Sequence, residues 1–236
     1  MNEFPMRINK YLAHKGMATR KGVDELIKSK KVLINKKVAV LGDKVNATDI
    51  VEVRGPHTKK DLVYFAYNKP IGIVTANPQG NEIDILKNID TKNIKAKVFP
   101  VGRLDKDSHG LIILTNDGRI TDRLLNPNNY HEKEYVVTVD KTVSPLFLKR
   151  MSEGVMIDKY KTRPAKVNKL GDKSFSIILT EGKNRQIRRM TEKLKYTVKD
   201  LQRVRIQNIK LEKTPLNSCR EIKGEEKETF LKSLGL

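Results

Sequence analysis

The sequence predicts an α+β fold in two parts, and three observations support this prediction. Short β-like runs recur along the chain, but they do not alternate regularly with helices as they would in a doubly wound sheet. A polar, turn-rich segment over residues 55–62 lacks hydrophobic periodicity and is typical of a linker. The length of 236 residues fits a small domain followed by a medium one. We therefore expect a first domain over residues 1–54 and a second domain over residues 63–236.

The first domain is predicted to combine two helices with short strands. Apolar residues at helical spacing begin at Ile8, and Gly16 can end this helix. Thr19 can cap a second helix, whose apolar face contains Val23 and Ile27. Three β-like runs follow, over residues 32–34, 38–40 and 50–53. The first two runs are expected to form a hairpin, and the third closes the unit as a strand.

The second domain contains more β-like runs than helical stretches. The β-like runs cover residues 63–67, 72–75, 111–115, 135–139 and 176–179. Helical periodicity covers residues 120–125 and 186–194, and the charged tail from Gly224 also favours a helix. This irregular order of elements is the reason for predicting an α+β fold.

The chain is strongly basic, with a formal net charge of +20. Residues 1–62 carry 14 basic and 7 acidic side chains, and residues 181–210 carry 10 and 3. These two concentrations predict two contacts with one polyanion, because Lys and Arg near phosphates release counterions. A solvated, lysine-rich surface is the alternative. The predicted helices of the first domain present the side chains that we expect to contact RNA: Arg7, Lys10, Lys15, Arg20 and Lys21.

The composition argues against several other classes of protein. Cys219 is the only cysteine, which excludes a disulfide within the chain and fits a reducing compartment. No apolar run approaches the roughly 20 residues that span a bilayer, and residues 1–7 lack the apolar region of a signal peptide. Metal-ligand spacing and a glycine-rich phosphate loop are also missing from the sequence. We therefore expect a cytoplasmic protein that uses no metal and no cofactor.

A first candidate segment for chemistry covers residues 102–110. Asp105 stands between Arg103 and Lys106, on a loop that enters a predicted strand. Neighbouring cations favour the ionised form of a carboxylate, which can then act as a nucleophile or a base. Taken alone, the segment favours a structural salt bridge on a turn over a catalytic carboxylate.

Two further segments add an aromatic ring and more cations. Lys133, Glu134 and Tyr135 open a predicted strand, where the tyrosine could be part of the core or could stack on a base. In residues 181–190 a glycine turn opens a cationic helix, and the N-terminus of such a helix suits phosphate binding. A solvated basic helix is the alternative for this last segment.

In their order and spacing, these segments resemble the RsuA/RluB/RluE/RluF family of pseudouridine synthases. The resemblance covers nearly the whole chain, and each motif alone is modest. The motifs match in this order: Lys69, Pro70 and Gly72; residues 102–108, with the Arg-Leu-Asp motif; residues 133–135, with the tyrosine motif; and residues 182–190, with the C-terminal motif.

The resemblance implies a fold and a reaction. Residues 7–53 would form an S4-like RNA-binding domain, and the second domain would be catalytic, with a mixed, largely antiparallel sheet and flanking helices. The implied reaction converts a specific uridine of ribosomal RNA to pseudouridine, and the target nucleotide must be flipped or already unpaired. Asn184 and Arg185 favour the RluF side of the family, and hence 23S ribosomal RNA. No cofactor is implied, and the expected oligomeric state is a monomer.

The resemblance also implies roles for single residues. Asp105 matches the catalytic aspartate, Tyr135 the tyrosine that packs on the target uracil, and Arg188 the arginine that pairs with the aspartate. Asp107 lies outside the matched positions, so we expect only a supporting role for it. The residues expected to contact the substrate are Arg103, Ile187, Lys183, Arg185 and Lys69.

The large ribosomal subunit or its assembly intermediates are the partners expected of the enzyme, but the sequence leaves two alternative interpretations open. One alternative is a non-catalytic RNA-binding or ribosome-assembly factor, for which the basic surfaces would suffice. It does not explain why Asp105, Tyr135 and Arg188 all stand at the matched positions. The other keeps the reaction and changes the target to 16S ribosomal RNA or to a transfer RNA.

Overall fold

The computed structural model of the chain divides into two compact units, and each is considered by itself. One unit contains residues 1–63 with 116–121, and the other contains residues 64–115 with 122–236. The structure describes residues 4–18, 20–54, 61–89, 94 and 96–236. The predicted cap Thr19 and residues 55–60 of the predicted linker lie outside the described residues.

The N-terminal unit has the two helices and the hairpin that the sequence predicts. Its elements are β1 (Met6–Arg7), α1 (Ile8–His14), α2 (Arg20–Lys28), β2 (Val32–Ile34), β3 (Lys37–Val38), β4 (Lys44–Val45) and β5 (Val51–Val53). β2 pairs with β3 and β5, and β1 pairs with β4. Left-handed backbone at Asn35 and Lys36 allows the tight turn between β2 and β3. Buried side chains from both helices, including Leu12 and Ile27, pack against Val32 and Val45 to form the core.

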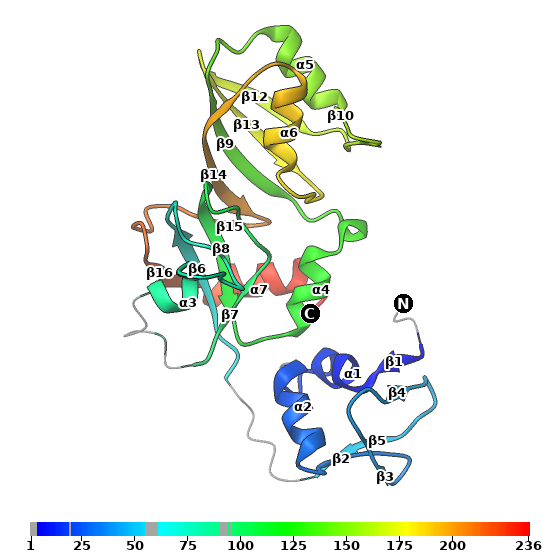
Figure 1. The fold of residues 1–236 in the computed structure, drawn as a ribbon. Helices are drawn as coiled ribbons and strands as arrows, with labels where there is room; N and C mark the ends of the chain where they lie inside the picture. The colour runs from blue at the N-terminus through cyan, green and yellow to red at the C-terminus, as the bar shows by residue number, and fades with distance from the viewer. Residues whose placement is uncertain (1–3, 19, 55–60, 90–93, 95) are drawn as a thin grey trace. The chain divides into compact units, whose positions relative to one another are not determined.

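The larger unit is built on one mixed sheet in the order β12-β13-β9-β14-β8-β6-β16, with β15 beside β14 and β7 beside β8 (Figure 1). The strands are β6 (Tyr64–Lys69), β7 (Phe99–Val101), β8 (His109–Thr115), β9 (Lys133–Val139), β12 (Lys166–Gly171), β13 (Ser174–Leu179), β14 (Val198–Ile206), β15 (Ile209–Lys210) and β16 (Cys219–Glu221). Within the described residues, the only parallel pairing in this sheet joins β14 to β8. The expected mixed, largely antiparallel sheet is thus confirmed.

Short helices flank this sheet. They are α3 (Ile85–Asn88), α4 (Arg119–Leu125), α5 (Pro145–Glu153), α6 (Gln186–Lys193) and α7 (Gly224–Ser233), with a 3-10 turn at Pro127–Asn129 and a small hairpin of β10 (Met156–Ile157) and β11 (Tyr160–Lys161). Helix α5 contacts β12, and α6 contacts β14, so both lie on the half of the sheet that contains β9 (Figure 1). Across the described part of the chain, we find no helix with the length and apolar character needed to cross a membrane.

The predicted strand over residues 72–75 is wrong. Gly72 has a φ of +87°, and its N–H donates to the carbonyl oxygen of Lys106 at 2.8 Å. The chain therefore turns against the loop between β7 and β8, and the segment keeps an isolated bridge between Val74 and Asp84. This turn helps to hold the loop that carries Asp105.

Gly110 lies where β8 closely approaches β14. Its φ is +103°, and a Cβ atom added there would lie 2.4 Å from the carbonyl oxygen of Arg203. We expect Gly110→Ala to lower the free energy of unfolding by more than about 2 kcal/mol, because it adds both backbone strain and a backbone clash. Urea unfolding would measure the loss beside Gly182→Ala, since a Cβ at Gly182 meets nothing within 4 Å. Equal losses in the two variants would contradict the prediction.

Candidate active site

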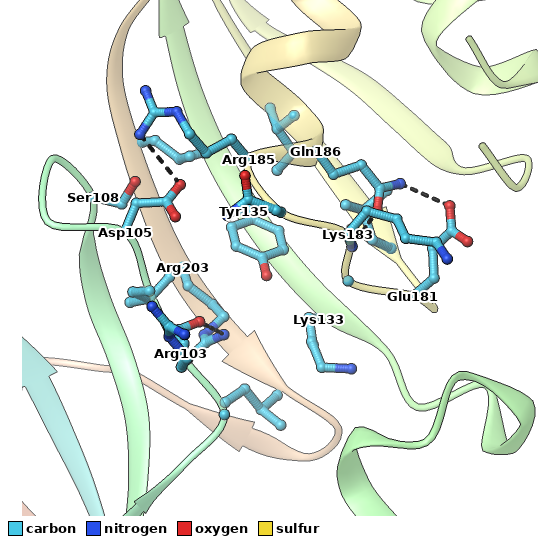
Figure 2. Close-up of a pocket in the computed structure, with 18 of the residues that line it drawn as sticks. Arg103, Asp105, Ser108, Lys133, Tyr135, Glu181, Lys183, Arg185, Gln186 and Arg203 are labelled. Carbon is cyan, nitrogen blue, oxygen red and sulfur yellow. Dashed lines mark hydrogen bonds and ion pairs between the residues drawn. The ribbon is translucent and has the colours of Figure 1, made fainter. Parts of the chain in front are cut away.

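The larger unit contains a cavity of about 390 Å³ on the face of the sheet where β9 and β14 are paired (Figure 2). The loop between β7 and β8 lines one side, and the segment between β13 and α6 lines another. Tyr135 and Arg203 are directly paired across the two strands, and Lys133 is two positions along β9. Strand alternation therefore places all three side chains on the cavity face. The volume falls within the range of small-ligand sites.

Asp105 lies at the edge of this cavity, on a loop that is fixed through its backbone. The carbonyl oxygen of Asp105 accepts hydrogen bonds from the Lys69 ammonium at 3.2 Å and from the Ser108 N–H at 3.1 Å. The same ammonium donates to the carbonyl oxygens of Pro70 and Ser108, at 2.9 and 2.8 Å. One lysine therefore holds three backbone carbonyls of the segments around Asp105.

This geometry corrects the prediction that Lys69 contacts the substrate. The Lys69 side chain is fully buried, and it is not among the residues that line the cavity. Burial lowers the pKa of Lys69 to about 8, while the charges of Asp105 and Asp107 act in the opposite direction. A lysine in a motif suggests a surface cation, because lysine is rarely buried without partners. Its partners here are carbonyl groups, which no residue pattern reveals.

The ion pair predicted between Arg188 and Asp105 is made by Arg185 instead. The Arg185 Nη1 atom lies 3.8 Å from the Asp105 carboxylate, and a dashed line marks this ion pair in Figure 2. Arg185 also donates two hydrogen bonds to the Asp107 carboxylate, at 3.0 and 2.9 Å, and these lower the pKa of Asp107. Arg188 is engaged elsewhere, because it donates to the Asp107 carbonyl oxygen at 2.8 Å and to the Ser108 hydroxyl at 3.1 Å. Both arginines thus hold the Asp105 loop through Asp107.

Tyr135 and Ile187 provide apolar surface inside the cavity. Both line it, with exposed fractions of 9% and 4%. Figure 2 shows the Tyr135 ring between Asp105 on one side and Lys183 and Glu181 on the other. An aromatic ring beside an aliphatic side chain suits the packing of a flat pyrimidine base.

A hydrogen-bond network around Glu181 fixes the turn that carries Lys183 and Arg185. The buried Glu181 carboxylate accepts hydrogen bonds from the Tyr160 hydroxyl and from the Gln186 amide, the latter at 2.8 Å. Gln186 accepts in turn from the Lys183 N–H at 3.0 Å. Arg185 then takes a left-handed conformation, with a φ of 48°, as the N-cap of α6. The network therefore positions the guanidinium that reaches Asp105 and Asp107.

The cavity is also lined by side chains to which the sequence analysis assigned no role in the site, among them Lys133, Glu181, Gln186 and Arg203. Lys133 was within reach of prediction, because it lies two residues before Tyr135 and so faces the same way on the strand. Glu181 and Gln186 carry no signal of their own, since their role depends on each other. Arg103, which was predicted, lines the cavity with an exposed side chain.

The basic residues predicted in the N-terminal unit are only partly brought together. Arg7, Lys10 and Arg20 line a second cavity of about 430 Å³ in this unit. Lys15 and Lys21 are exposed and are not among the residues that line this cavity. The Lys15 ammonium lies 5.7 Å from the centre of the Tyr11 ring.

Comparisons with known proteins agree on one family. A family model described as RNA pseudouridylate synthase matches residues 63–193, and an S4 domain model matches residues 6–51. The chain is 44% identical to the dual-specificity RNA pseudouridine synthase RluF of Escherichia coli (strain K12), over 94% of this chain and 77% of the relative. It is 36% identical to the ribosomal large subunit pseudouridine synthase B of Bacillus subtilis (strain 168), over 93% of each chain.

A solved structure supports the same assignment. The chain aligns with the crystal structure of a pseudouridylate synthase with a TM-score of 0.70 and 27% sequence identity. The alignment covers 97% of this chain and 99% of the solved chain. The synthase model spans the Asp105 loop, Tyr135 on β9 and the cationic helix α6, which are the elements that surround the cavity. The chain therefore belongs to the RNA pseudouridylate synthase family.

Proposed function

We propose that this enzyme converts a uridine of ribosomal RNA to pseudouridine in the cavity beside Asp105. The observation that carries the proposal is the position of the Asp105 carboxylate at a cavity lined by Tyr135 and Ile187. The proposed target is 23S ribosomal RNA, because one relative is described as a ribosomal large subunit pseudouridine synthase. The RluF relative is described as having dual specificity, so a test must include other RNAs.

In this reaction the bond between N1 of uracil and C1′ of ribose breaks, and a bond between C5 and C1′ forms. The C5 proton leaves and N1 gains a proton, so the nucleotide is isomerised without adding or losing atoms. Asp105 supplies the carboxylate next to the reacting atoms, and Tyr135 packs on the turning uracil. Arg185 and Arg188 keep the Asp105 loop in place through Asp107. The remaining proposed substrate contacts are Arg103, Lys183 and Ile187.

The defining experiment measures tritium released from uridine labelled at C5, in transcripts of 23S ribosomal RNA, 16S ribosomal RNA and transfer RNA. Release from 23S transcripts at one mapped site is the expected result. Release from 16S or transfer RNA alone would replace the proposed target and keep the reaction. If the enzyme released no tritium from any of these RNAs or from ribosomal assembly intermediates, the proposed function would be wrong.

We further propose that residues 1–54 anchor the RNA through the cavity lined by Arg7, Lys10 and Arg20. Replacing these three residues with glutamine should reduce the slope of log Kd against log salt by about 2 to 3. Each phosphate contact releases about one counterion on binding, and the variant makes three contacts fewer. Turnover at saturating RNA should be unchanged. A matched variant replaces the lysines of the β2–β3 hairpin and of β4: Lys36, Lys37 and Lys44. An equal loss of slope in that variant would assign RNA binding to overall charge and not to this cavity.

The proposed setting of the reaction is the cytoplasm, where a monomer modifies the large subunit or an assembly intermediate of it. The reducing environment fits a chain with one cysteine. Sedimentation of the enzyme with and without RNA would test the monomer, and a dimer in both conditions would contradict it.

A further inference from the structure

Two cations in the active-site cavity have no acidic partner in the described part of the chain. Lys133 and Arg203 are diagonal neighbours on the paired strands β9 and β14, and both line the cavity. Their hydrogen bonds go to backbone carbonyl oxygens and not to carboxylates. Each charge raises the cost of burying the other, because like charges repel strongly where water is excluded.

Arg203 is only 3% exposed, and one of its donor groups is unused. Its Nε atom donates to the Leu111 carbonyl oxygen at 2.7 Å, and Nη1 donates to the Arg103 carbonyl oxygen at 3.5 Å. The Nη2 atom is buried and has no hydrogen-bond partner among the residues that the structure describes. A buried charged donor without an acceptor is costly, so this atom marks a position where an acceptor from a ligand would be stabilising.

Lys133 is the second cation of the cavity with unused hydrogen-bond donors. Its ammonium has three N–H donors, and within the described ranges its only hydrogen bond goes to the His131 carbonyl oxygen at 3.2 Å. Burial and, to a smaller extent, the charge of Arg203 lower the pKa of Lys133 to about 8. The ammonium is still mostly protonated at neutral pH, and a neighbouring anion would stabilise that form.

The acidic residues of the cavity are already engaged with other partners. Asp105 forms its ion pair with Arg185, and Glu181 accepts hydrogen bonds from Tyr160 and Gln186. Lys133 and Arg203 both lie below the Tyr135 ring in the view of Figure 2, away from the Glu181 network. The negative charge that would balance these two cations must therefore come from a bound ligand.

We propose that Lys133 and Arg203 form an anion subsite that binds a backbone phosphate of the nucleotide flipped into the cavity. A flipped nucleotide brings its own phosphate with it, and this phosphate carries a permanent charge and several acceptor oxygens. Binding of this phosphate would thus offset part of the free-energy cost of flipping the nucleotide, and only when a nucleotide has entered the cavity. This inference rests on the proposed function, because it takes the ligand to be RNA.

The first test needs no turnover. Calorimetry compares the binding of uridine, uridine 5′-monophosphate and uridine 3′-monophosphate to the full-length enzyme. One monophosphate should bind at least about tenfold more tightly than uridine, as expected for hydrogen bonds between charged groups. Lys133→Met should remove this advantage, and Lys133→Arg should restore much of it. The matched control is Lys166→Met, because Lys166 is an exposed cation outside the cavity, with 77% of its side chain exposed.

A second test uses RNA in which the phosphate on either side of the target uridine is replaced by a neutral methylphosphonate. One replacement should raise the RNA concentration for half-maximal rate about tenfold in the wild type. The same replacement should have little further effect in Lys133→Met, because both changes remove one contact.

Additive losses would overturn the inference. It would also be overturned if Lys133→Met lowered the saturating rate while neither methylphosphonate had any effect, since the cation would then act on the uracil. Tritium release by the wild type on unmodified RNA tests the proposed function separately. Failure of the subsite and failure of the reaction are therefore distinguishable.

Discussion

Asp105→Asn should abolish tritium release, with a loss of roughly 1,000-fold or more, while RNA binding is retained. Asparagine keeps the shape of the side chain but removes the charge and the basicity that the reaction requires. The loop should survive the change, because Lys69 and the Ser108 N–H bind the backbone carbonyl of residue 105 and not its side chain. Rates from labelled RNA and affinities from fluorescence anisotropy would separate the two effects.

Asp107→Asn is the natural comparison for this variant. Asp107 receives the two hydrogen bonds of Arg185 and the ion pair of Arg188, at 3.4 Å, whereas Asp105 is the carboxylate that lines the cavity. We expect only a partial loss of rate for Asp107→Asn, because the arginines lose a partner but the reactive group stays. The assignment of Asp105 would be refuted by the reverse order, with Asp107→Asn inactive and Asp105→Asn active.

Lys69→Met should produce the second large effect, on both stability and turnover. Methionine fills a similar volume but leaves the carbonyls of Pro70, Asp105 and Ser108 without the donor that now joins them. We expect a loss of about 3 kcal/mol in the free energy of unfolding, together with a lower saturating rate, because the Asp105 loop is no longer held. Chemical denaturation and single-turnover kinetics would measure the two quantities.

The contribution of Lys69 to stability should also depend on pH. Its pKa is lowered to about 8 in the folded protein from the usual value of 10.5, so the unfolded chain binds more protons between these values. The free energy by which the wild type exceeds Lys69→Met should therefore rise as the pH increases from 8 toward 10. A matched control is Lys106→Met, since Lys106 lies on the Asp105 loop itself but is exposed and pairs with Glu82. A difference that falls over this range would show that burial does not disfavour the charged lysine.

The sequence predicted those elements whose apolar pattern matches the structure. Helix α6 and strand β9 were found because each has a regular buried face, and β8 was found because its apolar run is buried on both faces. The longest strand, β14, was not predicted, because one of its faces carries Arg203 where a simple strand would carry an apolar residue. A charged side chain on the cavity face removes the alternation on which strand prediction depends.

The sequence predicted which residues line the site better than it predicted the contacts between them. Asp105 and Tyr135 line the cavity as expected. The exchange of partners between Arg185 and Arg188 follows from the left-handed backbone at Arg185, which no spacing rule reveals. The burial of Lys69 likewise depends on carbonyl groups that come together only after folding. Sequence patterns identify side chains, whereas these contacts depend on the conformation of the backbone and on its carbonyl groups.

The position of β14 has a consequence for when the enzyme becomes active during synthesis. Within the described residues, β14 is the strand that joins β8 to β9, so it connects the half of the sheet bearing Asp105 to the half bearing Tyr135. A nascent chain that ends at residue 193 already contains Asp105, Tyr135 and Arg188 but lacks this strand. Such a chain would emerge from the ribosome with every motif present, but the two halves of the sheet that form the site would not be connected. Premature stop codons before residue 206 should therefore abolish RNA modification.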